Sequence, residues 1–256
     1  MIDLHCHILP GLDDGPAELA ESLKMCALAA RDGITDLVAT PHFQPDKYTH
    51  GLPEIRQAVV HLSARVAEAG IPLRLYPGGD VALDGEMLSW ARDKTLPTLA
   101  DNGRYFLMEP PDPWQLRGLE EMVFELQLLG LTPVITHPER IQGQGKSWGW
   151  LERLVDLGCL SQVTAMSLTG RFGKAVRRSS LELLERNLVH LVATDAHSPE
   201  RRPPVLSEAL HLLLDKAGEE RTRLMFKEWP QAVLEGRSFE VPSPDPPPRR
   251  RRFFFF

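Results

Sequence analysis

Two pairs of metal-binding side chains stand out in this sequence because a single residue separates the members of each pair. His5 and His7 flank Cys6 near the start, and Asp195 and His197 form a second pair late in the chain. Side chains two residues apart on a β-strand point to the same side, so each pair would present two ligands together. Cys6 would then point the opposite way, into packing. Each pair is a candidate part of a metal site.

Four further candidate ligands follow at intervals along the chain. They are His42, Asp80, Glu109 and His137. With the two pairs they make eight possible ligands, more than one ion can use, so we expect two or three ions. Mixed imidazole and carboxylate ligands without thiolate favour Mn²⁺, Zn²⁺ or Fe²⁺. Clustered ions of this kind activate water and hold both oxygens of a phosphoryl displacement, which indicates a phosphoesterase.

Asp14, in the segment GLDDGPAELAESL, has two interpretations. Asp caps helix N-termini well, and Pro16 would suit the first turn of a helix that follows it. The alternative is that Asp14 is a metal ligand. His61, His190 and His211 are lone histidines, which are usually structural, and we expect no ligand role for them.

Arginines follow two of the candidate ligand groups. Arg140 comes three residues after His137, and Arg201 and Arg202 come shortly after His197. The planar guanidinium pairs two oxygens at once, which suits it to holding a phosphate group. Arg140 and Arg202 are therefore predicted to contact phosphate, with Arg201 as the lesser candidate and a surface position as the alternative for each.

The cysteines do not fit a phosphatase that uses a thiol nucleophile, which carries Cys-x5-Arg. None of Cys6, Cys26 and Cys159 has an arginine six residues later. They are odd in number and widely spaced, so a disulfide framework is not expected either.

The candidate ligands lie mostly at the ends of short β-rich runs that alternate with helical patterns. Strands are predicted over 2–5, 35–40, 73–77, 104–109, 131–136, 159–166 and 189–194, and helices over 18–30, 54–69, 115–129, 148–157, 174–187 and 205–217. This alternation predicts βαβ units and a parallel sheet. Seven strands favour a closed or nearly closed α/β barrel, and an open doubly wound sheet is the other option. In both, the carboxyl ends of the strands form one face, where the ligands would converge.

Composition is consistent with one large domain. The chain has 256 residues, of which 43% are hydrophobic, and a formal charge of −6. An acidic balance argues against nucleic acid as a partner. We find no leader-like start and no run long enough to cross a membrane, so we expect a cytoplasmic protein without stable membrane insertion.

Residues 1–240 would form the barrel, and the Pro-, Arg- and Phe-rich residues 241–256 would form a disordered tail. The Arg run in that tail could instead touch a membrane or an acidic protein.

Several motifs together resemble one known family. MIDLHCHILPGLDDGP, ATPHF, THPER, SLTGRFG and TDAH follow one another in the order typical of the PHP (polymerase and histidinol phosphatase) superfamily. Within it, the chain resembles the bacterial tyrosine-protein phosphatases of capsule and exopolysaccharide operons. The resemblance spans residues 1 to about 240 and depends on several motifs matching in order and spacing.

The resemblance implies a distorted (β/α)₇ TIM-like barrel that holds three metals, with manganese the usual activator and Fe, Zn or Co as other options. Carried over residue by residue, the resemblance implies three sets of metal ligands. One metal would be bound by His5, His7, Asp80 and Asp195, a second by Asp80, Glu109 and His137, and a third by Asp14, His42 and His197. Arg140 and Arg202 would hold the phosphate. The family usually has Glu where this chain has Asp80, and the shorter carboxylate is expected to shift or weaken one of the metals.

The activity implied by the resemblance is direct hydrolysis of phosphotyrosine by a metal-activated hydroxide, without a phosphoenzyme. Asp14, His42 or a metal-bound water could supply the proton to the leaving group. The substrate would be a tyrosine-rich tail of a bacterial tyrosine autokinase that controls polysaccharide export. The loop from Phe43 to Gly51, which holds Tyr48 and His50, could line the substrate entrance or be an ordinary surface loop.

Two other functions stay open at this point. One is a PHP-family phosphatase acting on a small molecule such as histidinol phosphate. The other is a non-catalytic barrel that binds metal or the kinase without turnover. A nuclease is less favoured because the chain lacks a basic groove signal. A homo-oligomer is possible, but no residue pattern identifies an interface.

Overall fold

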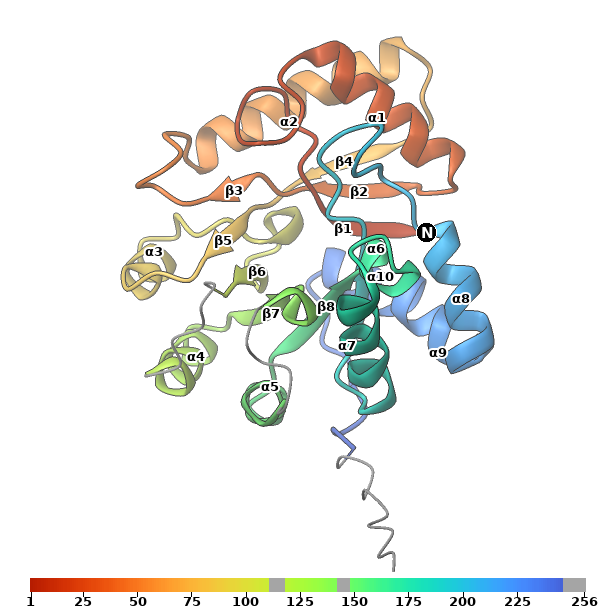
Figure 1. Cartoon of the computed structure of the whole chain (residues 1–256). Coiled ribbons are helices and arrows are strands. Elements are labelled where there is room, and N and C mark those ends of the chain that lie inside the picture. Colours follow the sequence, from red (N-terminus) through yellow and green to blue (C-terminus); the bar gives the residue numbers. More distant parts are fainter. Residues whose placement is uncertain (111–117, 142–147, 246–256) are drawn as a thin grey trace, which may run out of the picture.

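The computed structural model describes residues 1–110, 118–141 and 148–245, and shows a ring of parallel strands surrounded by helices (Figure 1). The strands are β1 (Ile2–Cys6), β2 (Asp36–Ala39), β3 (His42–Phe43), β4 (Arg74–Pro77), β5 (Asp80–Ala82), β6 (Tyr105–Glu109), β7 (Thr132–Thr136), β8 (Leu160–Thr164) and β9 (Leu191–Ala193). They pair in the orders β1-β2-β4 and β3-β5-β6-β7-β8-β9.

These nine segments amount to seven barrel strands. β3 follows β2, and β5 follows β4, after only two residues in each case, so each couple is one strand with a short interruption. The ring closes between β1 and the end of β9, where the Asp195 N–H donates to the His5 carbonyl and the His7 N–H donates to the Ala196 carbonyl, both at 2.8 Å. The expected seven-stranded barrel is confirmed over the open sheet.

Proline and glycine explain both interruptions. Pro41 lies between β2 and β3 and has no N–H to give to a neighbouring strand. Gly78 and Gly79 lie between β4 and β5, where the chain passes close to its neighbours. A Cβ at Gly78 would come within 2.7 Å of Val38 Cγ1, and one at Gly79 within 2.9 Å of Pro97 Cβ. Directly after these breaks, the chain continues with ligand candidates in β3 and β5.

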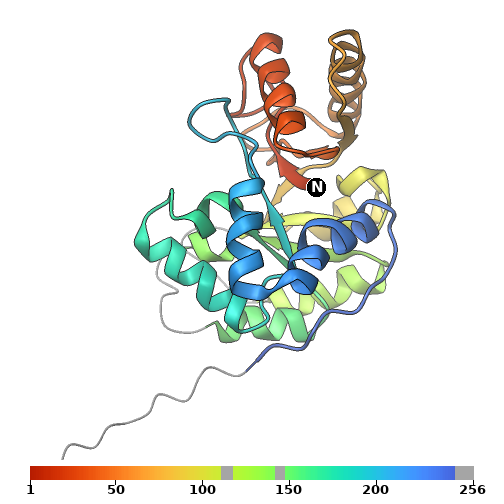
Figure 2. The ribbon, with the colours of Figure 1, turned by 90° about the vertical axis from the view of Figure 1, so that its right-hand side faces the viewer.

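The helices lie outside the barrel, as Figures 1 and 2 show. They are α1 (Leu19–Arg31), α2 (Leu52–Glu68), α3 (Met87–Arg92), α4 (Leu119–Leu128), α5 (Gly149–Asp156), α6 (Ala165–Thr169), α7 (Lys174–Glu185), α8 (Ser207–Ala217), α9 (Glu219–Arg223) and α10 (Trp229–Leu234), with short helical turns η1 (Leu99–Asp101), η2 (Pro138–Arg140) and η3 (Leu224–Glu228). The six predicted helices correspond to α1, α2, α4, α5, α7 and α8, although positions 115–117 of one prediction lie outside the described residues. No helix in the described part of the chain combines the length and apolar character that a bilayer crossing needs.

The elements that sequence reasoning missed are short or lie near the C-terminus. The strand expected over 159–166 ends at Thr164, and α6 begins at the next residue. The run from α9 to α10 covers the amino ends of the strands. There Trp229 lies against His190, just before β9, and Tyr105 at the start of β6 donates its hydroxyl hydrogen to the Arg237 carbonyl at 2.8 Å.

The predicted tail begins within the described residues. Positions 241–245 have no regular secondary structure, but the Asp245 N–H donates to the Arg186 carbonyl at 2.9 Å. Residues 246–256 lie outside the described residues, so disorder of the tail stays a prediction.

A buried hydrogen bond fastens the barrel seam, and it provides a stability test. Thr194 donates its hydroxyl hydrogen to Asp3 Oδ2 at 2.6 Å, and both residues are buried. Burial raises the pKa of Asp3 to about 6, although the bonds from Thr194 oppose this rise. Thr194→Val would leave a buried carboxylate oxygen without this partner, so we expect the free energy of unfolding to fall by about 1–3 kcal/mol.

The measurement is urea unfolding at pH 8 in the presence of a chelator, so that metal binding does not contribute. Thr35→Val is the matched control, because the exposed Thr35 donates a similar bond, 2.8 Å long, to Asp36 at the other edge of the β1–β2 pair. We expect a change within about 0.5 kcal/mol for the control. Equal losses in both variants would contradict a special role for the seam.

Candidate metal centre

The barrel brings all nine predicted metal ligands to the carboxyl ends of its strands. β1 carries His5 and is followed by His7. β3 begins with His42, β5 begins with Asp80, and β6 ends with Glu109. The remaining ligands lie in the segments after strands: Asp14 after β1, His137 after β7, and Asp195 and His197 after β9.

Their side chains form three overlapping groups in which the potential ligand atoms lie within 4.8 Å of one another. The groups are His7, Asp14, His42 and His197; His5, His7 and Asp80; and His42, Asp80 and Glu109. His7, His42 and Asp80 each belong to two groups. A polynuclear metal centre has this property, because neighbouring ions share bridging ligands.

The groups resemble the ligand sets expected from the family but differ in detail. The first contains the expected set of Asp14, His42 and His197, with His7 added. Asp195 was expected to bind the same metal as His5, His7 and Asp80, which form the second group. Its Oδ1 lies 3.6 Å from His5 Nε2 and 3.5 Å from His7 Nε2. His137 was expected with Asp80 and Glu109. Its Nε2 lies 3.5 Å from Glu109 Oε1, but His42 occupies its place in the third group.

Asp14 does not cap a helix, so the alternative interpretation of this residue is wrong. α1 begins only at Leu19 and Glu18 holds the capping position. Asp14 Oδ1 instead lies 3.4 Å from His197 Nε2 and 3.5 Å from His42 Nε2. The side chain is about half exposed, at 56%, and therefore stands at the solvent side of the group.

The carboxylate of Asp80 lies at the bottom of the cluster and passes a simple test for a metal ligand. It is fully buried, and neither of its oxygens accepts a hydrogen bond from a described residue. Oδ2 lies 3.4 Å from His5 Nε2 and 3.6 Å from His42 Nδ1. A buried carboxylate without hydrogen bonds is costly unless a cation compensates for it. The donor set is therefore chemically suited to divalent ions.

Opposing electrostatic effects act within the cluster. Burial lowers the pKa of His5, but the carboxylates of Asp80 and Asp195 outweigh burial and raise it to about 9. Burial and the charge on His197 lower the pKa of His7 to about 4, in spite of Asp13. Burial also raises the pKa of Glu109, with a further contribution from Asp80. Such shifted groups, close together in a barrel mouth, are typical of functional sites.

Two residues that sequence reasoning missed orient the histidines of the first pair. Asp13 Oδ2 lies 2.6 Å from His7 Nδ1, and Asp13 also accepts a hydrogen bond from the His42 N–H at 3.0 Å. Gln162 Oε1 lies 2.8 Å from His5 Nδ1. In metal proteins such partners fix the ring and tautomer so that the other nitrogen faces the metal. Asp13 could have been found as the neighbour of Asp14, but Gln162 lies in β8 and has no local signal.

Arg140 and Arg202 meet at Asp195, as the prediction of a shared phosphate site requires. Arg140 forms an ion pair with Asp195 Oδ2, and Arg202 Nη2 lies 2.6 Å from the same oxygen. Phe172, in the SLTGRFG segment, packs under both guanidinium groups, with its ring centre 5.2 Å from Arg140 and 5.8 Å from Arg202. Arg201 is exposed and forms no ion pair within the described residues, so it is the weaker candidate.

The other histidines and the cysteines stay outside the cluster. His190 is buried and accepts a hydrogen bond from the Ser161 N–H at 2.9 Å, whereas His61 and His211 are exposed. The three cysteines are buried, and burial raises the pKa of Cys26 to about 12. Buried thiols of this kind are poor nucleophiles.

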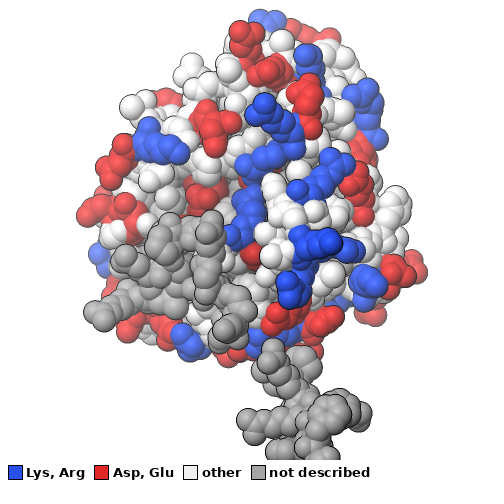
Figure 3. All heavy atoms as spheres, in the orientation of Figure 1, with Lys and Arg blue, Asp and Glu red and all other residues white. Residues whose placement is uncertain are grey.

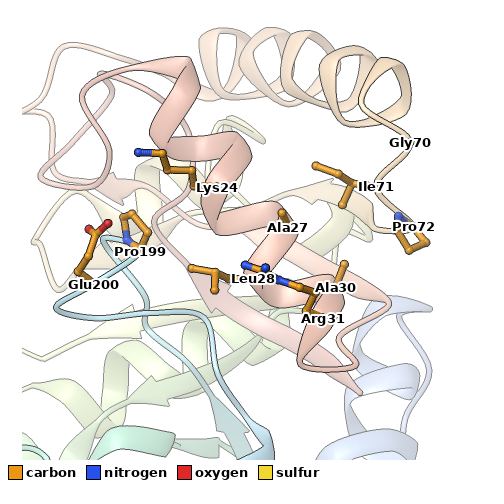
Figure 4. A pocket seen from close by; sticks show the side chains of 10 residues that line it. All are labelled: Lys24, Ala27, Leu28, Ala30, Arg31, Gly70, Ile71, Pro72, Pro199 and Glu200. Carbon is orange, nitrogen blue, oxygen red and sulfur yellow. The ribbon is translucent and has the colours of Figure 1, made fainter.

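Two cavities differ in their relation to the cluster. One of about 390 Å³ is lined by Glu109, His137 and Arg140 and so opens beside the ligands. A larger one of about 600 Å³ lies over the outer side of α1, between Ile71 and Pro199 (Figure 4). None of the nine predicted ligands lines the larger cavity, so its size does not make it the reaction site.

The loop predicted to border the entrance lies beside the cluster. The Tyr48 ring lies nearly parallel to the His42 ring, at 10° and 5.9 Å between centres. The Lys47 ammonium lies 4.8 Å from the centre of the Tyr48 ring. The loop therefore borders the candidate metal centre, and its role at the substrate entrance stays a prediction.

Comparison with known proteins agrees with the motifs. The family model described as "Capsular polysaccharide synthesis, CpsB/CapC" matches residues 1–235. The chain belongs to the CpsB/CapC family. It is 38% identical to tyrosine-protein phosphatase YwqE of Bacillus subtilis, over 93% of this chain and 99% of that protein. It is 31% identical to the putative tyrosine-protein phosphatase CapC of Staphylococcus aureus, over 96% of each chain.

A solved family structure has the same fold. It comes from work on YwqE from Bacillus subtilis and CpsB from Streptococcus pneumoniae, described as unique metal-dependent tyrosine phosphatases. The TM-score is 0.92 at 37% identity, over 96% of this chain and 99% of the other. A 2-pyrone-4,6-dicarboxylic acid hydrolase from Acinetobacter baumannii, described as probable, matches with a TM-score of 0.55 at 13% identity, over 92% of this chain and 98% of that one, which shows the barrel fold alone.

The contact between Asp13 and His7 leads to a prediction about metal binding. Asp13→Asn would remove the charge that orients His7, so we expect the affinity for Mn²⁺ to fall about 10- to 100-fold. Isothermal titration of the metal-stripped protein measures this. Asp46→Asn, at an exposed position of the loop after β3, is the matched control and should bind as the unmodified chain does. An unchanged affinity in Asp13→Asn would show that Asp13 does not support the metal centre.

Proposed function

We propose that the chain is a metal-dependent protein-tyrosine phosphatase that hydrolyses phosphotyrosine. The observation that carries this proposal is the gathering of nine His, Asp and Glu side chains at the barrel mouth, with two arginines that meet at one of them. The relatives named tyrosine-protein phosphatases cover nearly the whole chain and support the same activity.

The proposed centre holds two or three ions, with Mn²⁺ as the first choice and Fe, Zn or Co as the others. The proposed ligands are His5, His7, Asp14, His42, Asp80, Glu109, His137, Asp195 and His197. Ions bound there would activate water near neutral pH and neutralise charge that builds up during phosphoryl transfer. The imidazole-rich, thiolate-free donor set supports this choice of metals.

The chain's own residues have distinct roles in this proposal. Arg140 and Arg202 hold the phosphoryl oxygens, because their guanidinium groups converge on the Asp195 side of the cluster. Phe172 keeps both guanidinium groups in place through its ring. Asp14 and His42 lie on the solvent side, where the leaving group would depart, and are the candidate proton donors.

We propose that the substrate is a phosphotyrosine protein, in particular the tail of a bacterial tyrosine autokinase of polysaccharide biosynthesis. The description of the family as one of capsular polysaccharide synthesis supports this. Because such a kinase uses ATP, the dephosphorylation would take place in the cytoplasm. Assembly as a homo-oligomer is part of the proposal.

Metal dependence is the first test. Metal-stripped protein should release no phosphate from a phosphotyrosine peptide, and added Mn²⁺ should restore the release. His197→Ala, folded as judged by circular dichroism, should stay inactive with Mn²⁺ because it lacks one ligand of the group around Asp14.

Histidinol phosphate serves as the comparison substrate in the same assay. Turnover of histidinol phosphate without turnover of the peptide would point to a small-molecule phosphatase. Bound metal without turnover of either would point to a binding role.

The two neighbouring arginines allow a matched test of phosphate binding. Arg202→Ala should lower kcat/KM for the peptide by about 100-fold, the usual effect of removing one group that stabilises the transition state. Arg201→Ala removes an exposed charge one residue away and should stay within about twofold. Equal effects of the two substitutions would mean that Arg202 acts only through general surface charge.

A further inference from the structure

We propose that the cavity of about 390 Å³ beside Arg140 is the subsite for the aromatic ring of the substrate, with Leu83 and Ile141 as the residues that determine specificity for aryl phosphates. This inference rests on the proposed function and goes beyond it by assigning the part of the site that distinguishes phosphotyrosine from other phosphate esters.

The cavity is lined by both polar and apolar residues. Glu109, His137 and Arg140 belong to the proposed metal centre and phosphate site, and Gln44 is the other polar residue of the lining. Leu83, Pro110 and Ile141 are among the apolar residues of the lining. A phosphate ester bound at Arg140 would therefore have an apolar surface next to it for its organic group. A small alkyl phosphate buries little apolar area on such a surface, whereas an aromatic ring buries much more and gains accordingly.

Main-chain hydrogen bonds fix the backbone of both apolar residues relative to the candidate ligands. The Leu83 N–H donates to the Glu109 carbonyl at 2.9 Å, which ties Leu83 to the strand that carries a ligand. Ile141 directly follows Arg140 and its N–H donates to the Pro138 carbonyl at 3.3 Å. Ile141 is buried and Leu83 is half-buried, so they form a preformed wall.

The size of the cavity suits a ring and the start of its peptide. Pockets for small organic groups usually measure about 300–1,000 Å³, and this cavity lies at the lower end of that range. Phosphotyrosine places a rigid ring between its backbone and its phosphate. Phosphoserine has a single methylene there and would not reach the apolar wall while its phosphate lies at Arg140.

Tyr48 is the other candidate partner for a substrate ring, but its own neighbours make it less suitable. Lys47 lies over its ring, and the His42 ring lies parallel to it. Stacking a substrate ring on Tyr48 would have to displace or add to these contacts. The wall formed by Leu83 and Ile141 needs no such change.

Two phosphonates that cannot be hydrolysed separate ring binding from phosphate binding. Benzylphosphonate presents a ring next to its phosphonate, and methylphosphonate lacks the ring. Each is tested as a competitive inhibitor of phosphotyrosine peptide hydrolysis by the full, Mn²⁺-loaded chain. Leu83→Asn and Ile141→Thr should each raise the inhibition constant of benzylphosphonate about tenfold, as expected for loss of an apolar pocket contact. That of methylphosphonate should stay within about twofold.

Two further variants complete the test, one as a matched control and one as a substitute for Leu83→Asn. Leu128→Asn makes the same change at an exposed position of α4 and should behave as the unmodified chain does. Leu83→Phe would narrow the cavity without adding a polar side-chain atom, so it should also weaken benzylphosphonate alone, and it serves if Leu83→Asn does not fold.

Each result has a defined meaning. Selective weakening of benzylphosphonate supports the aryl subsite. Unchanged constants, or equal weakening of both phosphonates, would overturn it, as would selective weakening by Tyr48→Ala instead. A chain that never hydrolyses the phosphotyrosine peptide would refute the proposed function, and this failure is seen in the unmodified protein before any variant is made.

Discussion

The closure of the barrel between β1 and the end of β9 is the constraint on which the rest of the site depends. The main-chain bonds from Asp195 to His5 and from His7 to Ala196 place the first and last ligand pairs side by side, although about three quarters of the sequence separates them. Asp3 and Thr194 strengthen the same seam from within the core. A barrel that failed to close here would still have its ligands, but it would not have a common centre.

Closure also concentrates charge, and the surrounding residues compensate for it. The carboxylates of Asp80 and Asp195 are buried beside several imidazoles. Burial alone would raise the pKa of Asp195, but Arg140, His5 and Arg202 outweigh it and keep that pKa well below its usual range. Among the described residues, no arginine forms an ion pair with Asp80. The two carboxylates therefore differ, because one is paired with the proposed phosphate-binding arginines and the other faces the ligand histidines.

The barrel, and the gathering of the candidate ligands at its mouth, could be predicted from the sequence because their signals are local. His5 and His7 share a strand at a spacing of two, and His42, Glu109 and His137 mark the ends of apolar runs. Their assignment to individual ions stays a prediction, and the structure groups His42 rather than His137 with Asp80 and Glu109. Which side chains meet in one group depends on how the strands are staggered.

The features that escaped sequence reasoning depend on contacts between distant segments. Gln162 reaches His5 across 157 positions, and Phe172 lies under two arginines from other loops. The apolar side of the small cavity combines Leu83 with Ile141, and no pattern in either segment indicates that they share a wall. The helices from α9 to α10 were missed for a related reason, because their apolar residues cover the amino ends of strands rather than forming one more βα unit.

The position of Asp80 shows how the backbone can compensate for a shorter side chain. The resembled family usually carries Glu at this position, whose carboxylate reaches one methylene further. Here the backbone at Gly78 and Gly79, just before β5, lies close to Val38 and Pro97, and the register pairs Asp80 with His42. As a result, a single Asp80 oxygen lies within 3.6 Å of nitrogens from both His5 and His42. That oxygen therefore stands between two groups of candidate ligands, which is the position that the bridging role predicted for Asp80 requires.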